Sequence, residues 1–322
     1  MNAIASRAPS TEIATTAERL AGVAIGLAEA ATSPNTLRAY ESGARDFSRF
    51  CVELDAEALP ASPQTVALYV AALVDKGRSM STIHQRLAAI RFAHRRAGLD
   101  TPTAHPAVEA IIAGARRTVG TAPTPKRALL VADLRRIVRT LDRDTHQGRR
   151  DAALLLVGFA GAFRRSELVA LDVADLEFSD GGCVATVRRS KTDQSGEGRK
   201  VALPFGRGAT CPVRALRAWL DSAGITDGPV FRSMRKGNRV LEARLSAKGV
   251  ARVVKASAEL VGLDSAGFGG HSLRRGLVTS AVRAGKSDAE IMSTTGHKSR
   301  AMVDRYREDA GRFNDAASAG LL

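Results

Sequence analysis

Residues that could bind and attack a phosphate ester gather near the carboxyl end of the sequence. His271-Ser-Leu-Arg274 opens a predicted helix, so His271 and Arg274 would project from one face, beside backbone N–H groups that favour an anion. Gly296-His297 closes the next predicted helix, and Tyr306 lies in a final short one. The first pair would bind phosphate, and a tyrosine phenol could act as a nucleophile. Helix capping or packing explains an isolated histidine equally well.

Two further candidates lie upstream of this cluster. Arg164 follows a predicted buried helix, where a guanidinium needs a counter-charge from Glu167 or from a bound phosphate. Taken alone, a structural Arg–Glu pair is the commoner explanation. Lys191 lies at the mouth of a predicted hairpin, on a loop that could reach a ligand. By itself it would be an ordinary surface lysine.

The order and local context of these residues resemble the tyrosine recombinase (phage integrase) family. The family's catalytic set is Arg, Lys, His-x-x-Arg, His or Trp, and Tyr, which would fall here on Arg164, Lys191, His271, Arg274, His297 and Tyr306. Glu167 matches the acidic residue that steadies the family's active site. The resemblance covers nearly the whole chain after residue 33, and the segments 81–87 and 94–98 look like those of Cre-type members.

Departures from the family pattern are small. His297 stands where Cre-type members can carry Trp, and Arg165 stands where many relatives carry an apolar residue. In the doublets Arg164-Arg165 and Arg274-Arg275, the first member is assigned as catalytic by the family register.

The resemblance implies roles for each group. Arg164 and Arg274 would clamp the phosphate, because the guanidinium fork offers fixed, fully charged donors. A phenol is mostly protonated at neutral pH, since its reference pKa is about 10, so the nucleophile Tyr306 needs a base, for which His271 is the candidate. Lys191 would protonate the departing 5′ oxygen, and His297 would hydrogen-bond the phosphate. We expect no metal, because His271 and His297 have no carboxylate or thiolate partners at ligand spacing. We expect no ATP, because no Walker-type motif occurs and the resemblance implies that a phosphotyrosine conserves the bond energy.

Composition agrees with a polyanionic partner in a reducing compartment. Lys and Arg number 48 against 33 Asp and Glu, which gives a net charge of +15. Three distant cysteines indicate neither a disulfide framework nor a zinc site, so we expect a cytoplasmic protein of bacterial, phage or plasmid origin. The N-terminal stretch indicates no signal peptide or membrane span. Only 4% of residues are aromatic, which disfavours an RNA-binding protein that stacks bases.

The pattern predicts a mainly α fold with two domains. A flexible arm over residues 1–33, with one amphipathic helix over 18–30, precedes an all-helical core-binding domain over residues 34–117. Four helices are expected there, from Pro34, from Ser62-Pro63 to Gly77, over 81–97 and over 106–117. Glycine, small polar residues and two prolines indicate an extended linker over residues 118–127.

A mostly helical catalytic domain with a small antiparallel β-sheet is expected over residues 128–322. Strands over 184–189 and 200–203 would form a hairpin around a polar loop. The predicted helices cover residues 133–141, 151–163, 212–223, 246–261, 272–284, 288–295 and 299–309.

The resemblance implies that the helical domain clamps a DNA duplex opposite the catalytic domain. In the first domain, the candidate contacts lie on exposed helix faces: Arg38, Thr82, Gln85 and Arg86. In the second domain, a basic loop over 231–239 offers Arg235 and Lys236, and the next helix offers Lys248 and Arg252. We expect backbone contacts, with base reading at Lys248. A solvated surface is the alternative for each charge.

The family likeness further implies a double-stranded DNA with a specific inverted-repeat site, and a tetramer on two such sites. An apolar tail over residues 316–322 would dock into a neighbouring protomer, with a frayed terminus as the alternative. The stretch before Pro34 is short for a separate arm-binding domain, so we expect a recombinase without a large accessory complex. Two rivals remain, a topoisomerase-like relaxer and a non-cutting DNA-binding regulator, although a regulator would be expected to lose at least one of the six catalytic residues.

Overall fold

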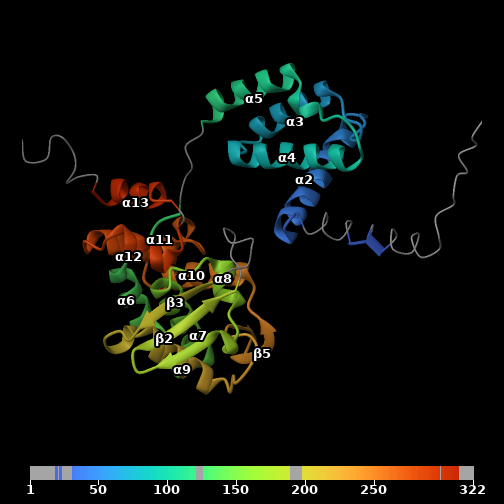
Figure 1. The fold of residues 1–322 in the computed structure, drawn as a ribbon. Helices are drawn as coiled ribbons and strands as arrows, with labels where there is room; N and C mark the ends of the chain where they lie inside the picture. The colour runs from blue at the N-terminus through green and yellow to red at the C-terminus, as the bar shows by residue number, and fades with distance from the viewer. Residues whose placement is uncertain are drawn as a thin grey trace, which may run out of the picture. The chain divides into compact units, whose positions relative to one another are not determined.

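The computed structural model describes residues 19–20, 22–23, 31–120, 126–188, 198–297 and 299–311. The chain separates into two compact units, residues 1–124 and 125–322, and helices dominate both (Figure 1). The predicted fold class, mainly α with small antiparallel sheets, is confirmed. Most of the helix expected over 18–30, part of the linker, the loop that carries Lys191 and the tail over 316–322 lie outside the described residues. None of the helices that are described is both long and apolar enough to cross a bilayer.

Within residues 31–120 of the first unit, four α-helices begin where the sequence carries a capping residue. They are α2 (Pro34–Glu53), α3 (Pro63–Asp75), α4 (Met80–Arg96) and α5 (Pro106–Val119), with the short η1 (Pro102–Ala104) before the last. The hydroxyls of Ser33, Ser62 and Ser79 each accept a backbone N–H from the first turn of the following helix. α2 packs against α4 and α3 against α5, and their apolar faces form one core around Phe47, Val66 and Ile83.

The second unit combines helices with a three-stranded sheet. Its helices are α6 (Val131–Thr140), α7 (His146–Ala160), α8 (Arg165–Ala170), α9 (Pro212–Ser222), α10 (Ala247–Glu259), α11 (Ser272–Arg283), α12 (Asp288–Thr295) and α13 (Ala301–Gly311). The strands β1 (Leu176–Ser179), β2 (Gly182–Val187) and β3 (Arg199–Pro204) pair antiparallel in chain order, with Val184 opposite Ala202.

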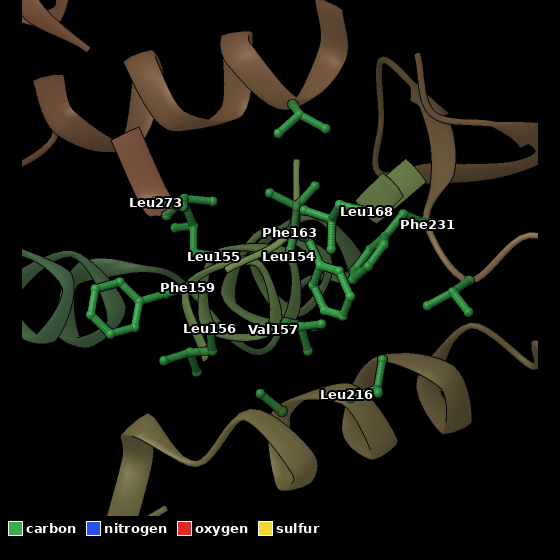
Figure 2. Packing of buried hydrophobic residues seen from close by; sticks show 14 of the residues in the cluster. Leu154, Leu155, Leu156, Val157, Phe159, Phe163, Leu168, Leu216, Phe231 and Leu273 are labelled. Atoms are coloured by element: carbon green, nitrogen blue, oxygen red, sulfur yellow. The ribbon is translucent and has the colours of Figure 1, made fainter. Parts of the chain in front are cut away.

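Helix α7 is the centre of the second core and the scaffold for the candidate site. Its residues Leu154, Leu155 and Val157 are completely buried, with α9 and α11 packed against different sides of the helix (Figure 2). Gly158 lets α11 come close, because a Cβ at that position would lie 2.8 Å from Cδ1 of Leu273. This contact fixes the start of α11, and therefore Arg274, against the end of α7.

Two expectations about local structure were wrong, and one strand was missed. The predicted basic loop over 231–239 is instead part of a hairpin of β4 (Arg232–Arg235) and β5 (Arg239–Arg244), whose turn places Gly237 and Asn238 at positive φ. Strand β1 was not predicted. Helix α7 begins at His146 rather than at residue 151, because Thr145 caps it. Its first turn is polar, so the apolar pattern alone predicted a start that was too late.

Candidate active site

One buried carboxylate, that of Glu167, joins two guanidinium groups from distant parts of the chain. Its Oε1 accepts from Nη1 of Arg164 at 2.5 Å, and its Oε2 accepts from the Arg164 backbone N–H at 3.0 Å and from Nη2 of Arg199, on β3, at 3.1 Å. Burial alone would raise the pKa of Glu167, but these hydrogen bonds and the charges of Arg199 and Arg164 outweigh it and lower the pKa. The ionised Glu167 is therefore the counter-charge of Arg164.

Arg274 enters the same cluster from the first turn of α11. Its side chain is buried, and Nη1 donates to the carbonyl of Ala162 at 2.8 Å. Ala162 has a φ of +46°, an uncommon conformation for a residue other than glycine, which turns the chain between α7 and α8. Nη2 of Arg274 is also buried, and no group among the described residues accepts a hydrogen bond from it. That N–H is placed to donate to an anion.

The positive charges of the cluster act on one another. Burial lowers the pKa of Arg274 most, the charges of Arg164 and Arg199 act in the same direction, and those of Glu167 and Tyr306 oppose them, so that the resulting pKa is about 10. Arg274 therefore stays protonated at neutral pH.

His297 is buried at the turn between α12 and α13. Burial, together with the charges of Arg274, Arg164 and Arg199, lowers its pKa to about 4, so the imidazole is neutral at pH 7 in the free protein. Its Nδ1 lies 3.0 Å from the hydroxyl oxygen of Thr295. The ring is thus held in place inside the same group of guanidiniums.

Tyr306 lies on α13 beside this histidine. The two rings are stacked, with centroids 6.4 Å apart and an interplanar angle of 24°, and the guanidinium carbon of Arg275 lies 5.3 Å from the tyrosine ring centroid. An apolar cluster anchors the helix, in which Val303 packs with Val278 of α11 and Ile291 of α12. The phenol is half-buried.

The structure thus gathers five of the seven predicted catalytic-site residues: Arg164, Glu167, Arg274, His297 and Tyr306. His271 is the exposed N-cap of α11, next to Gly270, beside which the side chain of Arg165 passes. Lys191 lies outside the described residues. Among the residues that are described, no group of three or more His, Cys, Asp or Glu side chains is arranged to hold a metal ion.

Comparison with known proteins identifies the family of this arrangement. The model described as "Phage integrase family" matches residues 127–312, and that described as "Phage integrase, N-terminal SAM-like domain" matches residues 26–97. An integrase/recombinase xerD homolog of Selenomonas ruminantium is 40% identical over 304 residues, which cover 93% of this chain and 89% of the relative. The chain belongs to the phage integrase family of tyrosine recombinases.

Two further matches to this tyrosine recombinase have lower sequence identity. The recombinase cre of Escherichia phage P1 is 27% identical over 296 residues, covering 86% of this chain and 84% of the relative. A lambda integrase dimer bound to a COC′ core site has a TM-score of 0.59 and 21% identity, covering 91% of this chain and 95% of that structure. At that identity the structural likeness shows the fold alone.

The residues predicted to contact DNA are not equally accessible in this tyrosine recombinase. Arg38 of α2 and Gln85 of α4 are exposed, whereas Thr82 and Arg86 of α4 are half-buried. Nε of Arg86 lies 3.4 Å from Oδ2 of Asp46, so part of its charge is already compensated within the protein. In the second unit, exposed side chains are found at Arg235 on β4, at Lys236 in the turn after it and at Lys248 on α10.

Sequence reasoning missed Arg199 as part of the site. Besides binding Glu167, its Nη1 donates to the carbonyl of Thr294 at 2.7 Å, close to His297. Gly296, with a φ of +65°, leaves room for it, because a Cβ there would lie 3.0 Å from the Arg199 side chain. Arg199 therefore ties β3 to both the Arg164 turn and the His297 turn. An arginine directly before a predicted strand was the only signal.

We expect Arg199→Met to lower the free energy of unfolding by about 1–3 kcal/mol, because Glu167 and the Thr294 carbonyl lose a charged donor. Urea unfolding of the full chain measures this. The control is Arg217→Met, since the exposed Arg217 lies over the Phe178 ring and its loss should cost under about 0.5 kcal/mol. Equal effects of the two substitutions would contradict a joining role for Arg199.

Proposed function

We propose that this protein is a site-specific DNA recombinase that cleaves and rejoins DNA through a 3′-phosphotyrosine bond to Tyr306, and exchanges strands between two recognition sites in a tetrameric synapse. The charge balance of the cluster carries the proposal. Within the described part of the cluster, the guanidiniums of Arg164, Arg199 and Arg274 share one carboxylate, that of Glu167, which leaves an excess of two positive charges among these four groups. A phosphodiester has one negative charge and gains a second as it is attacked, so DNA supplies what the cluster lacks.

The proposed cleavage step is a transfer of the phosphoryl group from a sugar oxygen to tyrosine. His271 accepts the phenol proton, the Oη of Tyr306 bonds to phosphorus, and the bond from phosphorus to the 5′ oxygen breaks. Lys191 gives that oxygen a proton. Arg164, Arg274 and His297 hydrogen-bond the non-bridging oxygens. Attack by a 5′ hydroxyl from the second duplex reverses the step and releases Tyr306, so no bond energy is lost.

The two units have separate roles in this proposal. Residues 34–117 form a core-binding clamp on the duplex, residues 118–127 a linker and residues 128–322 the catalytic domain. Arg38, Thr82 and Gln85 contact DNA from the first unit, with Arg86 after rearrangement of its pair with Asp46. In the second unit, Arg235, Lys236 and Lys248 contact DNA. Lambda integrase structures of this fold, with a dimer on a core site and a tetramer on a Holliday junction, support the association of several protomers with DNA.

The test is incubation of the purified protein with DNA fragments from the neighbourhood of its own gene. A denaturing gel should show a protein–DNA adduct that protease removes. The cleaved strand should have a free 5′ hydroxyl, which polynucleotide kinase can label, and a 3′ end blocked by peptide. A plasmid carrying two copies of the cleaved sequence should then yield recombinant circles or deletions without added metal or ATP.

Each rival gives a different result in this assay. A topoisomerase-like relaxer would form the adduct and relax a plasmid with one site, but would give no exchange between two sites. A non-cutting regulator would bind the DNA with no adduct. A free 3′ hydroxyl and a blocked 5′ end would overturn the proposed polarity.

A further inference from the structure

The hydroxyl of Thr295 contacts both a backbone carbonyl and a ring nitrogen of His297. Thr295 is fully buried, and its Oγ1 donates its one hydrogen to the carbonyl of Ile291 at 2.8 Å. The same oxygen lies 3.0 Å from Nδ1 of His297. With its one hydrogen on the Ile291 carbonyl, the hydroxyl can only accept from Nδ1 in that contact. This arrangement assigns the proton of the neutral ring to Nδ1 and a lone pair to Nε2.

Charged and titratable groups from four parts of the fold face His297. They are Arg164 before α8, Arg199 on β3, Arg274 on α11 and Tyr306 on α13. The three guanidiniums, together with burial, keep the ring neutral in the free protein. A neutral ring with its lone pair on Nε2 can accept a hydrogen bond through that atom but cannot donate one to a phosphate oxygen.

We propose that Thr295 is a positioning residue that holds the proton of His297 on Nδ1, so that Nε2 takes up a proton when a DNA phosphate enters the site. The phosphate offsets the surrounding positive charge, which makes an imidazolium favourable, and the charged ring then donates through Nε2 to the phosphate. Phosphate binding and proton uptake are thereby coupled. This uptake rests on the proposed function, whereas the location of the proton in the free protein does not.

The first experiment uses the free protein and needs no DNA. Long-range ¹H–¹⁵N spectra of the histidine rings distinguish the two tautomers, and His297→Gln assigns the signals. We expect the Nδ1–H form in the wild type and in Thr295→Ser, which keeps the hydroxyl. Thr295→Val should shift the ring mainly to the Nε2–H form, because Nδ1–H would have no acceptor. The matched control is Thr294→Val on the neighbouring residue, whose hydroxyl donates to the Glu290 carbonyl at 3.1 Å.

A wild-type ring in the Nε2–H form, or one that Thr295→Val leaves unchanged, would overturn the positioning role. The second experiment binds the cleaved sequence, as a duplex, to the Tyr306→Phe protein by calorimetry in buffers of different ionisation enthalpy. We expect uptake of about one proton more than in the Tyr306→Phe, His297→Gln double variant. Equal uptake would overturn the coupling. If no DNA is ever cleaved, the proposed function fails, but the tautomer measurement still decides the role of Thr295.

Discussion

Tyr306→Phe should bind its DNA site as tightly as the wild type and form no covalent adduct. The phenylalanine ring keeps the stacking on His297 and the contact with the Arg275 guanidinium, so α13 should stay in place. Only the nucleophilic oxygen is lost. We expect the cleavage rate to fall by about 10⁵-fold or more, the scale seen when a catalytic nucleophile is removed. Gel shift measures the binding, and a denaturing gel measures the adduct.

The sequence offers a matched control for this substitution. Its three tyrosines are Tyr40, Tyr69 and Tyr306. Tyr40 lies on α2, and its ring centroid is 4.9 Å from that of Phe92. Tyr40→Phe therefore makes the same chemical change at a position far from Tyr306 in the sequence, and it keeps the ring contact. It should form the adduct at the wild-type rate. An adduct in Tyr306→Phe would show that another residue is the nucleophile.

Arg274→Lys should lower the cleavage rate by about 10³-fold while changing DNA affinity little, because a lost transition-state donor mainly slows the chemical step. The guanidinium of Arg274 offers donors to two partners, since Nη1 donates to the Ala162 carbonyl and Nη2 is the proposed donor to the phosphate. A lysine keeps the charge but has no planar fork to make both contacts. Single-turnover cleavage of the mapped site measures the rate, separately from binding.

The control for this prediction lies on the same helix. Arg283 ends α11 and is exposed, so Arg283→Lys makes the same exchange outside the site and should cleave at the wild-type rate. If Arg274→Lys cleaved normally, one charged donor would suffice, and the fork geometry would have no role in the reaction.

Local signals in the sequence predicted where helices begin better than where contacts form. Ser62 precedes a proline and caps its helix as predicted, because the cause is contained in a few neighbouring residues. Ser33 caps the helix that was predicted to start at Pro34. The hairpin of β4 and β5 was missed because its residues are mostly polar and lack strand alternation. Its Gly237-Asn238 turn was the available signal.

The candidate site was predictable by residue type and order but not by contact. The sequence could not decide whether Glu167 or a phosphate is the partner of Arg164. The fold was needed, because Glu167 also accepts a hydrogen bond from Arg199, on a strand whose position relative to Glu167 the sequence does not give. The tautomer of His297 needed the fold as well, since it depends on how a helix-end threonine directs one hydrogen. The role of Lys191 stays a prediction.

The Glu167 carboxylate, which Arg164 and Arg199 share, has a consequence for the stage at which DNA cleavage could begin. Arg164 and Glu167 come before the three-stranded sheet, and Arg199 lies on its last strand. His297 follows α12 and Tyr306 lies on α13, so no short stretch of the chain contains all of these site residues. A chain still emerging from the ribosome lacks the tyrosine, and an unfolded one lacks the assembled phosphate clamp. Under the proposed mechanism neither could break DNA, so strand cleavage would begin only with a finished, folded molecule.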